Sequence, residues 1–180
     1  NHVFLKMGLA HYRSKSSYQK ETPIAILEMG FGTGLNVLLT FFEAQKTQTS
    51  IQYTGIEAYP ISSEEIKAMD YVSLIKEKDA QGVYNSLHKT PWESQEEISP
   101  LFQLTKRQQR FEDIIDQNAF DLVYFDAFGA RVQPELWGEM IFKKMYTALR
   151  ENGVLVTYAA KGSVRRALQA VGFEVERLPG

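Results

Sequence analysis

Apolar runs and helical repeats alternate along this chain, and their order predicts its fold. Short continuous apolar runs such as Ile24-Ala25-Ile26-Leu27 are typical of strands buried on both faces of a sheet. The strands predicted in this way are 24–27, 51–56, 102–105, 120–125, 154–158 and 173–177. Apolar residues at helical spacing predict helices over 33–46, 62–90 with breaks, 134–151 and 163–171, whereas the acidic segment 93–97 lies between two prolines and predicts a loop. This alternation is typical of an α/β, Rossmann-like fold, a mostly parallel twisted sheet with helices on both faces.

Three alternating glycines follow the first predicted strand, at Gly30, Gly32 and Gly34. Glycine lets the backbone turn sharply and lets a ligand lie close to the main chain, and the helix that follows would point free N–H groups at this ligand. The dinucleotide pattern G-x-G-x-x-G does not fit, because Leu35 stands at its third glycine. The pattern is instead E-x-G-x-G-x-G, beginning at Glu28, which is typical of S-adenosylmethionine-dependent methyltransferases. The alternative is a structural glycine-rich turn.

Several residues near these glycines are candidates for holding the methyl donor. Glu57 ends the second predicted strand, 23 residues after the last glycine, where a carboxylate can accept hydrogen bonds from both ribose hydroxyls. Glu112, or its neighbour Asp113, precedes a later strand and is a candidate for binding the adenine amino group. Asn36 can help to seat the donor or can satisfy a local backbone group. Phe31 can pack against the donor or beneath the loop.

Asp126 follows the strand 120–125 directly, and ligands of parallel sheets bind outside the carboxyl ends of the strands. Attack on a sulfonium methyl group requires the lone pair of a neutral amine. A carboxylate at this position can accept an N–H hydrogen bond, orient the lone pair and stabilise the positive charge that develops. Asp126 is therefore the candidate catalytic residue beside the donor, and Phe128 is a candidate to cover the substrate. The alternative is that Asp126 caps the helix predicted from Pro134 or braces the loop.

The composition narrows the class of protein. The chain has 180 residues, of which 44% are hydrophobic and 23% charged, so it has the size of one globular domain. It has no cysteine, which excludes disulfides, thiolate metal sites and a cysteine nucleophile, and its three histidines show no metal-ligand spacing. No apolar run reaches 18 residues, so we expect no membrane span and a cytoplasmic location. The net charge of −2 implies that any RNA site is a local basic patch.

These motifs together resemble one family, the tRNA 5-methylaminomethyl-2-thiouridine methyltransferases. The segments that carry the resemblance span nearly the whole chain in the family's order: 2–9, 28–36, 55–60, 126–137 and 157–173. The loop from Gly30 to Asn36 and the segment with Asp126, Phe128 and Trp137 are more specific than a general methyltransferase signature. The resemblance implies a class I methyltransferase fold, S-adenosylmethionine as donor, and N-methylation of 5-aminomethyl-2-thiouridine at the wobble position of tRNA.

The resemblance also implies an arrangement of domains and a partner. The chain departs from the family pattern at Gly129, Ala130 and Gln133, which changes the loop after Asp126 but not the chemistry. It is shorter than the family at both ends, so we interpret residues 1–180 as a single methyltransferase domain trimmed at both ends. In some bacteria this domain is fused to an FAD-dependent oxidase that makes the aminomethyl substrate. The implied partners are therefore tRNA and such an oxidase, fused or separate.

Basic and aromatic residues near the predicted site are candidates for contacting the RNA. Phosphate contacts by basic side chains would make binding salt-dependent. The basic candidates are Lys161, Arg165 and Arg166, with a second cluster of Lys106, Arg107 and Arg110. A flipped wobble base would stack on Phe128 or Tyr158. Two other functions stay open: a related methyl- or aminopropyl-transferase acting on a small-molecule amine, and a non-catalytic RNA-binding module.

Overall fold

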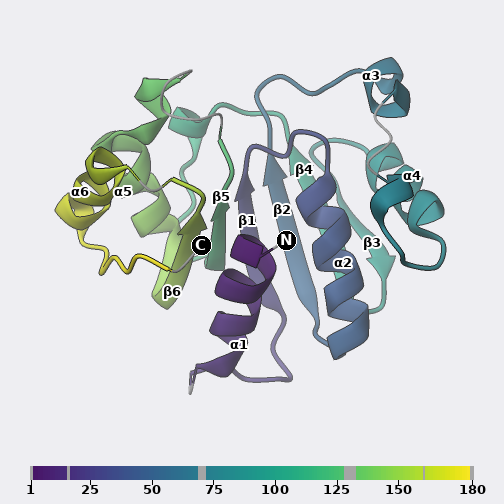
Figure 1. Cartoon of the computed structure of the whole chain (residues 1–180), viewed down its shortest axis with the longest axis horizontal. Helices are drawn as coiled ribbons and strands as arrows, with labels where there is room; N and C mark the ends of the chain where they lie inside the picture. Colours follow the sequence, from purple (N-terminus) through teal and green to yellow (C-terminus); the bar gives the residue numbers. More distant parts are fainter. Residues whose placement is uncertain (1, 16, 69–71, 128–132, 160, 179–180) are drawn as a thin grey trace.

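The computed structural model describes residues 2–15, 17–68, 72–127, 133–159 and 161–178. Its centre is a six-stranded sheet with the strand order β3-β4-β2-β1-β5-β6 (Figure 1). The strands are β1 (Ile24–Met29), β2 (Ile51–Ile56), β3 (Gln95–Ser99), β4 (Phe102–Arg107), β5 (Phe120–Phe125) and β6 (Leu149–Thr157). All neighbouring strands are parallel except β3, which pairs antiparallel with β4 at one edge. The predicted α/β, Rossmann-like fold is confirmed.

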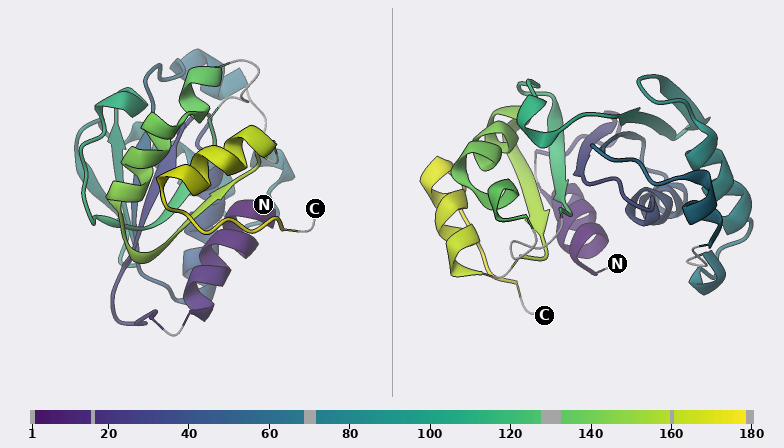
Figure 2. Two further views of the ribbon diagram at one scale, coloured as in Figure 1. Left: turned by 90° about the vertical axis from the view of Figure 1, so that its left-hand side faces the viewer. Right: turned by 90° about the horizontal axis from the view of Figure 1, so that it is seen from above.

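Helices cover both faces of this sheet (Figure 2). One face carries η1 (His2–Ala10), α1 (His11–Ser14), α2 (Leu35–Thr47) and α4 (Ala80–Lys89). The other face carries η3 (Phe111–Asp113), η4 (Pro134–Trp137), α5 (Glu139–Ala148) and α6 (Gly162–Val171). The short helices α3 (Ser63–Ala68) and η2 (Val72–Leu74) belong to the connection between β2 and α4. Among the described residues, no helix combines the length and the apolarity needed to cross a membrane.

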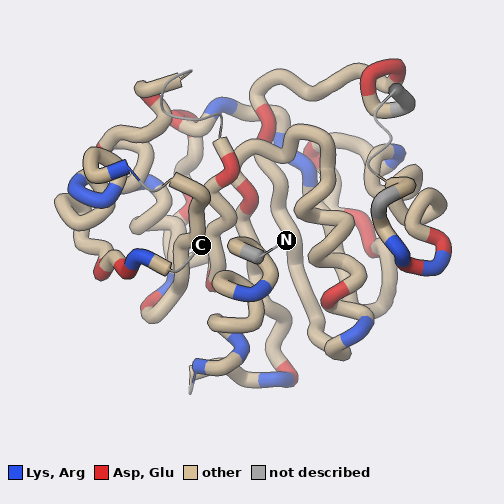
Figure 3. The backbone as a smooth tube through the Cα atoms, viewed as in Figure 1, with Lys and Arg blue, Asp and Glu red and all other residues tan. Residues whose placement is uncertain are grey.

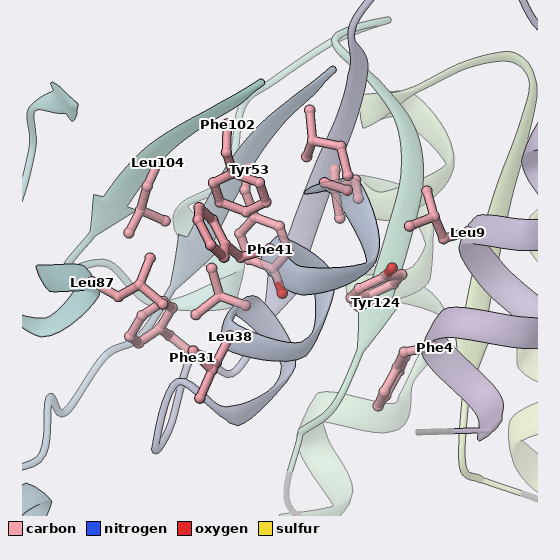
Figure 4. Packing of buried hydrophobic residues seen from close by; sticks show 14 of the residues in the cluster. Phe4, Leu9, Phe31, Leu38, Phe41, Tyr53, Leu87, Phe102, Leu104 and Tyr124 are labelled. Carbon is pink, nitrogen blue, oxygen red and sulfur yellow. The ribbon is translucent and has the colours of Figure 1, made fainter. Parts of the chain in front are cut away.

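Aromatic side chains fill the core between the sheet and α2 (Figure 4). The Phe102 ring of β4 lies 5.4 Å from the Phe41 ring of α2 and stacks at 5.9 Å on Tyr53 of β2. Each such side chain contributes about 1.5 to 3 kcal/mol through burial. Every residue of β1 and β5 is buried, because helices cover both faces of these strands. The core therefore holds the central strands, whose ends carry the site, in fixed positions.

The strand order reverses beside β1, with β2 and β4 on one side and β5 and β6 on the other. The backbone N–H of Asp126, just after β5, donates a hydrogen bond of 3.0 Å to the carbonyl oxygen of Met29 at the end of β1. The carboxyl ends of the parallel strands lie along the upper edge of the sheet in Figure 1. Ligands of open α/β sheets bind in the crevice at such a reversal. The fold therefore brings together the residues that follow β1, β2 and β5.

The two predictions at the edges of the sheet are wrong. The acidic segment 93–97 is not a loop throughout, because Gln95–Ser99 forms β3, in which Gln95 pairs with Thr105 of β4. Charged residues on an edge strand oppose further strand pairing, and they also remove the apolar signal of a strand. The segment 173–177, all of it described, forms no strand. Phe173 and Val175 pack against the core at alternate positions, which explains the strand-like pattern without any strand partner.

The helices are shorter and more numerous than their pattern predicts. The helix predicted over 134–151 divides at Gly138, whose extended backbone separates η4 from α5, and β6 then begins at Leu149. The helical stretch predicted over 62–90 contains α3, η2 and α4. The amino-terminal helices η1 and α1 were not predicted, although Phe4 and Leu9 of η1 are buried in the core.

Candidate active site

The loop between β1 and α2 requires its glycines. Gly30, Gly32 and Gly34 have φ values of +92°, +49° and +75°, a region of backbone conformation that favours glycine. At Gly30 an added Cβ atom would lie 2.8 Å from the carbonyl oxygen of Asp126, so a side chain there would displace the end of β5. Gly34 is the residue before α2, whose first N–H groups have no helical partner. The loop thus brings polar backbone groups close to any ligand beside it.

A cavity of about 650 Å³ lies beside this loop, at the carboxyl ends of the central strands. It brings together seven of the predicted site residues: Gly30, Phe31, Gly32, Asn36, Glu57, Glu112 and Asp126. Glu28 and Gly34, which were also predicted to bind the donor, adjoin the loop but do not line the cavity. The further lining residues include Tyr59, Phe111, Gln133 and Leu136. Residues far apart in the sequence therefore face one cavity.

Glu57 is held in place by two backbone groups. Its Oε2 accepts a hydrogen bond of 3.0 Å from the N–H of Gly32, and its Oε1 accepts one of 3.0 Å from the N–H of Tyr59. Each carboxylate oxygen can accept further hydrogen bonds, so both stay available to a ligand in the cavity. This geometry suits the pair of adjacent hydroxyls of a ribose, which was the predicted role.

The structure distinguishes the two acids considered as ligands of the adenine, Glu112 and Asp113. Glu112 lines the cavity, and its Oε1 forms an ion pair of 2.6 Å with Nη2 of Arg110, which also lines it. Asp113 is exposed and does not line the cavity. Of the two, Glu112 is therefore the residue in a position to contact a donor, while its role with the adenine stays a prediction.

Asp126 is half-buried at the cavity wall, directly after β5. Its Oδ2 accepts a hydrogen bond of 2.8 Å from Nδ2 of Asn36, in the first turn of α2. Burial raises the pKa of Asp126 above its ordinary value, and the hydrogen bond from Asn36 opposes this rise. No Lys or Arg among the described residues forms an ion pair with Asp126. The carboxylate is thus fixed in position but has no cationic partner in the described chain.

Glu28 lies behind this wall and is completely buried. Its Oε1 accepts a hydrogen bond of 2.9 Å from the same Nδ2 atom of Asn36, whereas its Oε2 has no hydrogen-bond partner among the described residues. Burial raises the pKa of Glu28 to about 8, and the charges of Asp126 and Glu57 add to this rise. Glu28 therefore adjoins the predicted donor site from inside the protein and does not face the cavity.

The underside of the glycine loop is aromatic and contains a buried lysine. The Phe31 ring is 3% exposed and lies 6.1 Å from the His88 ring and 6.0 Å from the Trp92 ring. Of the two roles considered for Phe31, its side chain fits packing beneath the loop. Lys106 is 2% exposed and donates a hydrogen bond of 3.0 Å to the carbonyl oxygen of His88, with its Nζ 5.1 Å from the Trp92 ring centre.

Of the second basic cluster predicted to bind RNA, Lys106 is removed from the surface, whereas the side chains of Arg107 and Arg110 are 29% and 64% exposed and each forms an ion pair. Lys106 is buried, and burial lowers its pKa to about 8. Arg107 forms a salt bridge of 2.8 Å with Asp116, and Arg110 pairs with Glu112. The sequence places these residues at a strand end, but their pairing depends on neighbours that the sequence order does not reveal.

Three of the predicted substrate-contact residues, Tyr158, Lys161 and Arg165, are described by the structure and do not line the cavity. Tyr158 follows β6, is 56% exposed and meets the Phe4 ring edge-on at 4.9 Å. Burial raises the pKa of Tyr158, and the charge of Asp126 adds to this rise. Lys161 and Arg165 are exposed at the start of α6, a helix with several basic positions (Figure 3). Phe128 lies outside the described residues.

Sequence reasoning missed several residues of the cavity wall. Tyr59, two residues after Glu57, is 76% exposed and lines the cavity. Its position immediately beyond the second strand was the available signal. Phe111 comes from η3, a short helix that has no periodic pattern to predict it, and Leu136 comes from η4, the first part of the helix predicted over 134–151. These residues add apolar surface that a nucleoside base requires.

The chemistry of the cavity fits S-adenosylmethionine. The loop of positive-φ glycines offers backbone N–H groups, and Glu57 offers paired acceptors. Glu57 and Asp126 both line the cavity, and neither forms an ion pair with a described Lys or Arg. Such an arrangement suits a nucleoside that carries a positively charged sulfur. Fold and site together define a Rossmann-like, class I S-adenosylmethionine-dependent methyltransferase.

Comparison with known proteins narrows this class. Residues 102–180 match a family model described as S-adenosyl-L-methionine-dependent methyltransferase. The chain is 30% identical over 86% of its length to the tRNA 5-methylaminomethyl-2-thiouridine biosynthesis bifunctional protein MnmC of Paracidovorax citrulli, and 27% identical over 99% of its length to that of Leptospira interrogans. It spans 26% and 28% of these two proteins, about a quarter of their length.

A solved structure agrees with the sequence comparison. The structure of MnmC2 from Aquifex aeolicus superposes with a TM-score of 0.68 over 92% of this chain and 50% of that one, at 20% sequence identity. At this identity the likeness establishes the fold. The family resemblance predicted from the sequence is confirmed, since the similarity to MnmC proteins extends over most of the chain.

Proposed function

We propose that residues 1–180 form a methyltransferase domain that converts 5-aminomethyl-2-thiouridine to 5-methylaminomethyl-2-thiouridine at the wobble position of cytoplasmic tRNA. The observation that carries the proposal is that the glycine loop, Glu57 and Asp126 face one cavity. The names of the MnmC relatives support the choice of acceptor. A small-molecule amine or a non-catalytic role has no comparable observation in its favour.

Each residue has a defined task in this proposal. When bound, S-adenosylmethionine supplies a methyl group made electrophilic by a positively charged sulfur. The backbone of Gly30–Gly34 contacts the methionine end of the donor, Glu57 accepts hydrogen bonds from the ribose, and Glu112 accepts one from the adenine. Placing these groups at a strand reversal directs the methyl group toward the carboxyl end of β5.

Asp126 acts on the acceptor amine. Its Oδ2 accepts the hydrogen bond from Asn36, which leaves Oδ1 to accept an N–H of the amine. This hydrogen bond orients the nitrogen lone pair toward the methyl group. As the N–C bond forms and the C–S bond breaks, the carboxylate stabilises the positive charge on nitrogen and can accept the proton that the nitrogen then loses.

The acceptor requires further contacts and a source. We infer that Tyr158 stacks on a base and that Lys161 and Arg165 contact phosphates; the exposure of all three side chains supports this. The relatives are bifunctional proteins of which this chain matches about a quarter. We infer that an FAD-dependent oxidase, fused or separate, supplies the primary amine.

The test is transfer of labelled methyl from S-adenosylmethionine to tRNA from cells that lack the modification, with fully modified tRNA as the control. The tRNA is digested to nucleosides and the label is located by chromatography. We expect label only in the hypomodified tRNA and only in the wobble nucleoside. Label in another nucleoside, or transfer to a small amine instead of tRNA, would contradict the proposed acceptor. Turnover of the decarboxylated donor in preference to S-adenosylmethionine would indicate an aminopropyltransferase.

A further inference from the structure

One amide nitrogen connects the wall of the cavity to the buried interior. Nδ2 of Asn36 donates to Oδ2 of Asp126 at 2.8 Å and to Oε1 of Glu28 at 2.9 Å. Both partners are carboxyl oxygens, so the nitrogen of the amide, which carries two hydrogens, is the atom that faces them. Three separate elements meet here: Asn36 belongs to α2, Glu28 to β1, and Asp126 follows β5.

The far end of this chain of hydrogen bonds is rigid. Glu28 is 0% exposed, and its strand pairs with β2 and β5 on either side. Asn36 is fixed in the first turn of α2, where its carbonyl oxygen accepts a hydrogen bond of 2.7 Å from the Thr40 hydroxyl. Asp126, by contrast, stands where its strand has ended and a loop begins. The orientation of the Asp126 carboxylate therefore depends on what holds it from behind.

We propose that Asn36 and Glu28 are positioning residues for Asp126: Glu28 fixes the Asn36 amide, and the amide fixes the carboxylate that receives the acceptor amine. The inference rests on the catalytic role proposed for Asp126. Neither residue contacts the acceptor in this arrangement. Their effect on the rate passes through Asp126, which distinguishes them from residues that hold the donor.

The electrostatics of Glu28 agree with an anchoring role. Burial raises its pKa to about 8, so at neutral pH it is mostly protonated, with one oxygen left to accept the hydrogen bond from Asn36. The groups that face it are the carboxylates of Asp126 and Glu57 and the buried hydroxyls of Tyr53 and Tyr124. A neutral Glu28 holds the amide without competing with Asp126 as a second negative charge.

The first experiment is a double-mutant cycle of N36A and D126A, measured as kcat at saturating donor and tRNA. We expect N36A alone to lower kcat about 10- to 100-fold with S-adenosylhomocysteine affinity changed less than about three-fold. In the D126A background, N36A should change kcat less than about two-fold. The variant N36D keeps the shape of the side chain but removes the donated hydrogens, so it should be no better than N36A.

The outcomes separate the positioning role from the function on which it rests. Equal losses from N36A in both backgrounds would overturn the positioning role and leave Asp126 in place. A weaker donor affinity with unchanged kcat would make Asn36 a donor-binding residue and also overturn it. If D126A itself retains full turnover, the catalytic role of Asp126 fails, and the positioning role fails with it. Full activity in N36D would show that shape alone matters, which also contradicts the proposal.

The second experiment tests Glu28 by conservative rescue. Glu28→Leu removes the acceptor oxygen at similar volume, whereas Glu28→Gln keeps an uncharged acceptor in the same place. We expect E28L to lower kcat about as much as N36A, and E28Q to recover most of that loss. Circular dichroism and thermal melts verify that both variants are folded. Equal kcat values for folded E28L and E28Q would overturn the role of Glu28 as an anchor.

Discussion

Carboxylates that are buried or half-buried lie at both ends of the central strands, and their partners differ between the two ends. At the amino end, Oδ2 of Asp121 accepts a hydrogen bond of 2.8 Å from the N–H of Ala25 and one of 2.9 Å from Nη1 of Arg150. At the carboxyl end, Glu28, Glu57 and Asp126 have no ion pair with any described Lys or Arg.

The difference shows which end is structural and which is available to a ligand. The charge of Asp121 is satisfied within the protein, so nothing further is required there. At the carboxyl end, burial raises the pKa of Glu28 to about 8 and that of Asp126 above its ordinary value, which means that the fold keeps carboxylates in an unfavourable environment. Titratable groups with perturbed pKa values of this kind concentrate at functional sites. A cationic sulfur and a developing ammonium ion would stabilise the charged form of Asp126.

The largest expected effect is a loss of kcat when Asp126 is changed to asparagine. The same change at Asp121 serves as the comparison. D126N keeps the shape of the side chain but removes its negative charge, and we expect kcat to fall about 100- to 1,000-fold, about 3 to 4 kcal/mol in activation free energy. Affinity for S-adenosylhomocysteine should change less than about three-fold. D121N, at the opposite end, is the matched control and should keep its kcat. Radiolabel transfer and calorimetry measure both quantities.

Two results would break this comparison. A D126N variant with normal kcat would make Asp126 a structural residue like Asp121. A D121N variant that folds normally but loses methyl transfer would show that the amino end of the sheet also serves the reaction.

The next largest expected effect is a change in the free energy of unfolding with pH, caused by the titration of Glu28. Its pKa is about 8 in the folded protein against an ordinary 4.5, so the folded state keeps a proton that the unfolded state releases between these values. The free energy of unfolding should therefore fall as the pH rises from about 5 to about 8 and then level off, with a slope of at most about 1.4 kcal/mol per pH unit. E28Q lacks this proton, so its stability relative to the wild type should increase over the same window.

Urea denaturation of the wild type and E28Q at several pH values from about 5 to about 9 measures this difference. Parallel curves for the two proteins would show that Glu28 does not titrate in this window. The amino end supplies a comparison, because D121N removes a carboxylate that already has a cationic partner and leaves Glu28 in place. It should therefore retain the wild-type fall in stability.

The carboxylates at the carboxyl end also show how much of the site could be predicted from the sequence alone. Glu57 and Asp126 could be placed at one site because each directly follows an apolar strand, and parallel strands end at one edge of a sheet. Asn36 was predicted to hold the donor or a backbone group, and its bridge between Glu28 and Asp126 was not foreseen. That bridge depends on where α2 packs against β1 and β5, which no spacing in the sequence encodes.

Elements without an apolar period were the hardest to predict. β3 is an exposed edge strand with glutamates, so its pairing with β4 is visible only once the sheet is assembled. Lys106 reads as a surface cation, yet β4 turns it inward beneath the glycine loop, where it meets Trp92 and the carbonyl oxygen of His88. In both cases tertiary contacts override the local preference of the residue.

A smaller effect is expected from E57A. This variant tests whether Glu57 binds the donor while Asp126, at the same end of the sheet, acts on the acceptor. Loss of two hydrogen bonds to the ribose should weaken binding of S-adenosylhomocysteine about 10- to 100-fold, as measured by calorimetry. At saturating donor, kcat should fall much less than in D126N. E112A, which removes one contact to the adenine, should weaken binding only a few-fold. Equal affinities for the wild type and E57A would exclude Glu57 from the donor site.

The smallest effect is expected at the amino end, where removing a satisfied charge should change stability but not chemistry. D121N loses the ion pair with Arg150 and weakens the hydrogen bond from Ala25, which we expect to lower the free energy of unfolding by about 1 to 2 kcal/mol and Tm by a few degrees. R150M removes the same pair from the other side, so the double variant should lose less than the sum of the two single variants. Additive losses would mean that the two residues stabilise the fold independently. In that case Arg150 would not be the residue that neutralises the charge of Asp121.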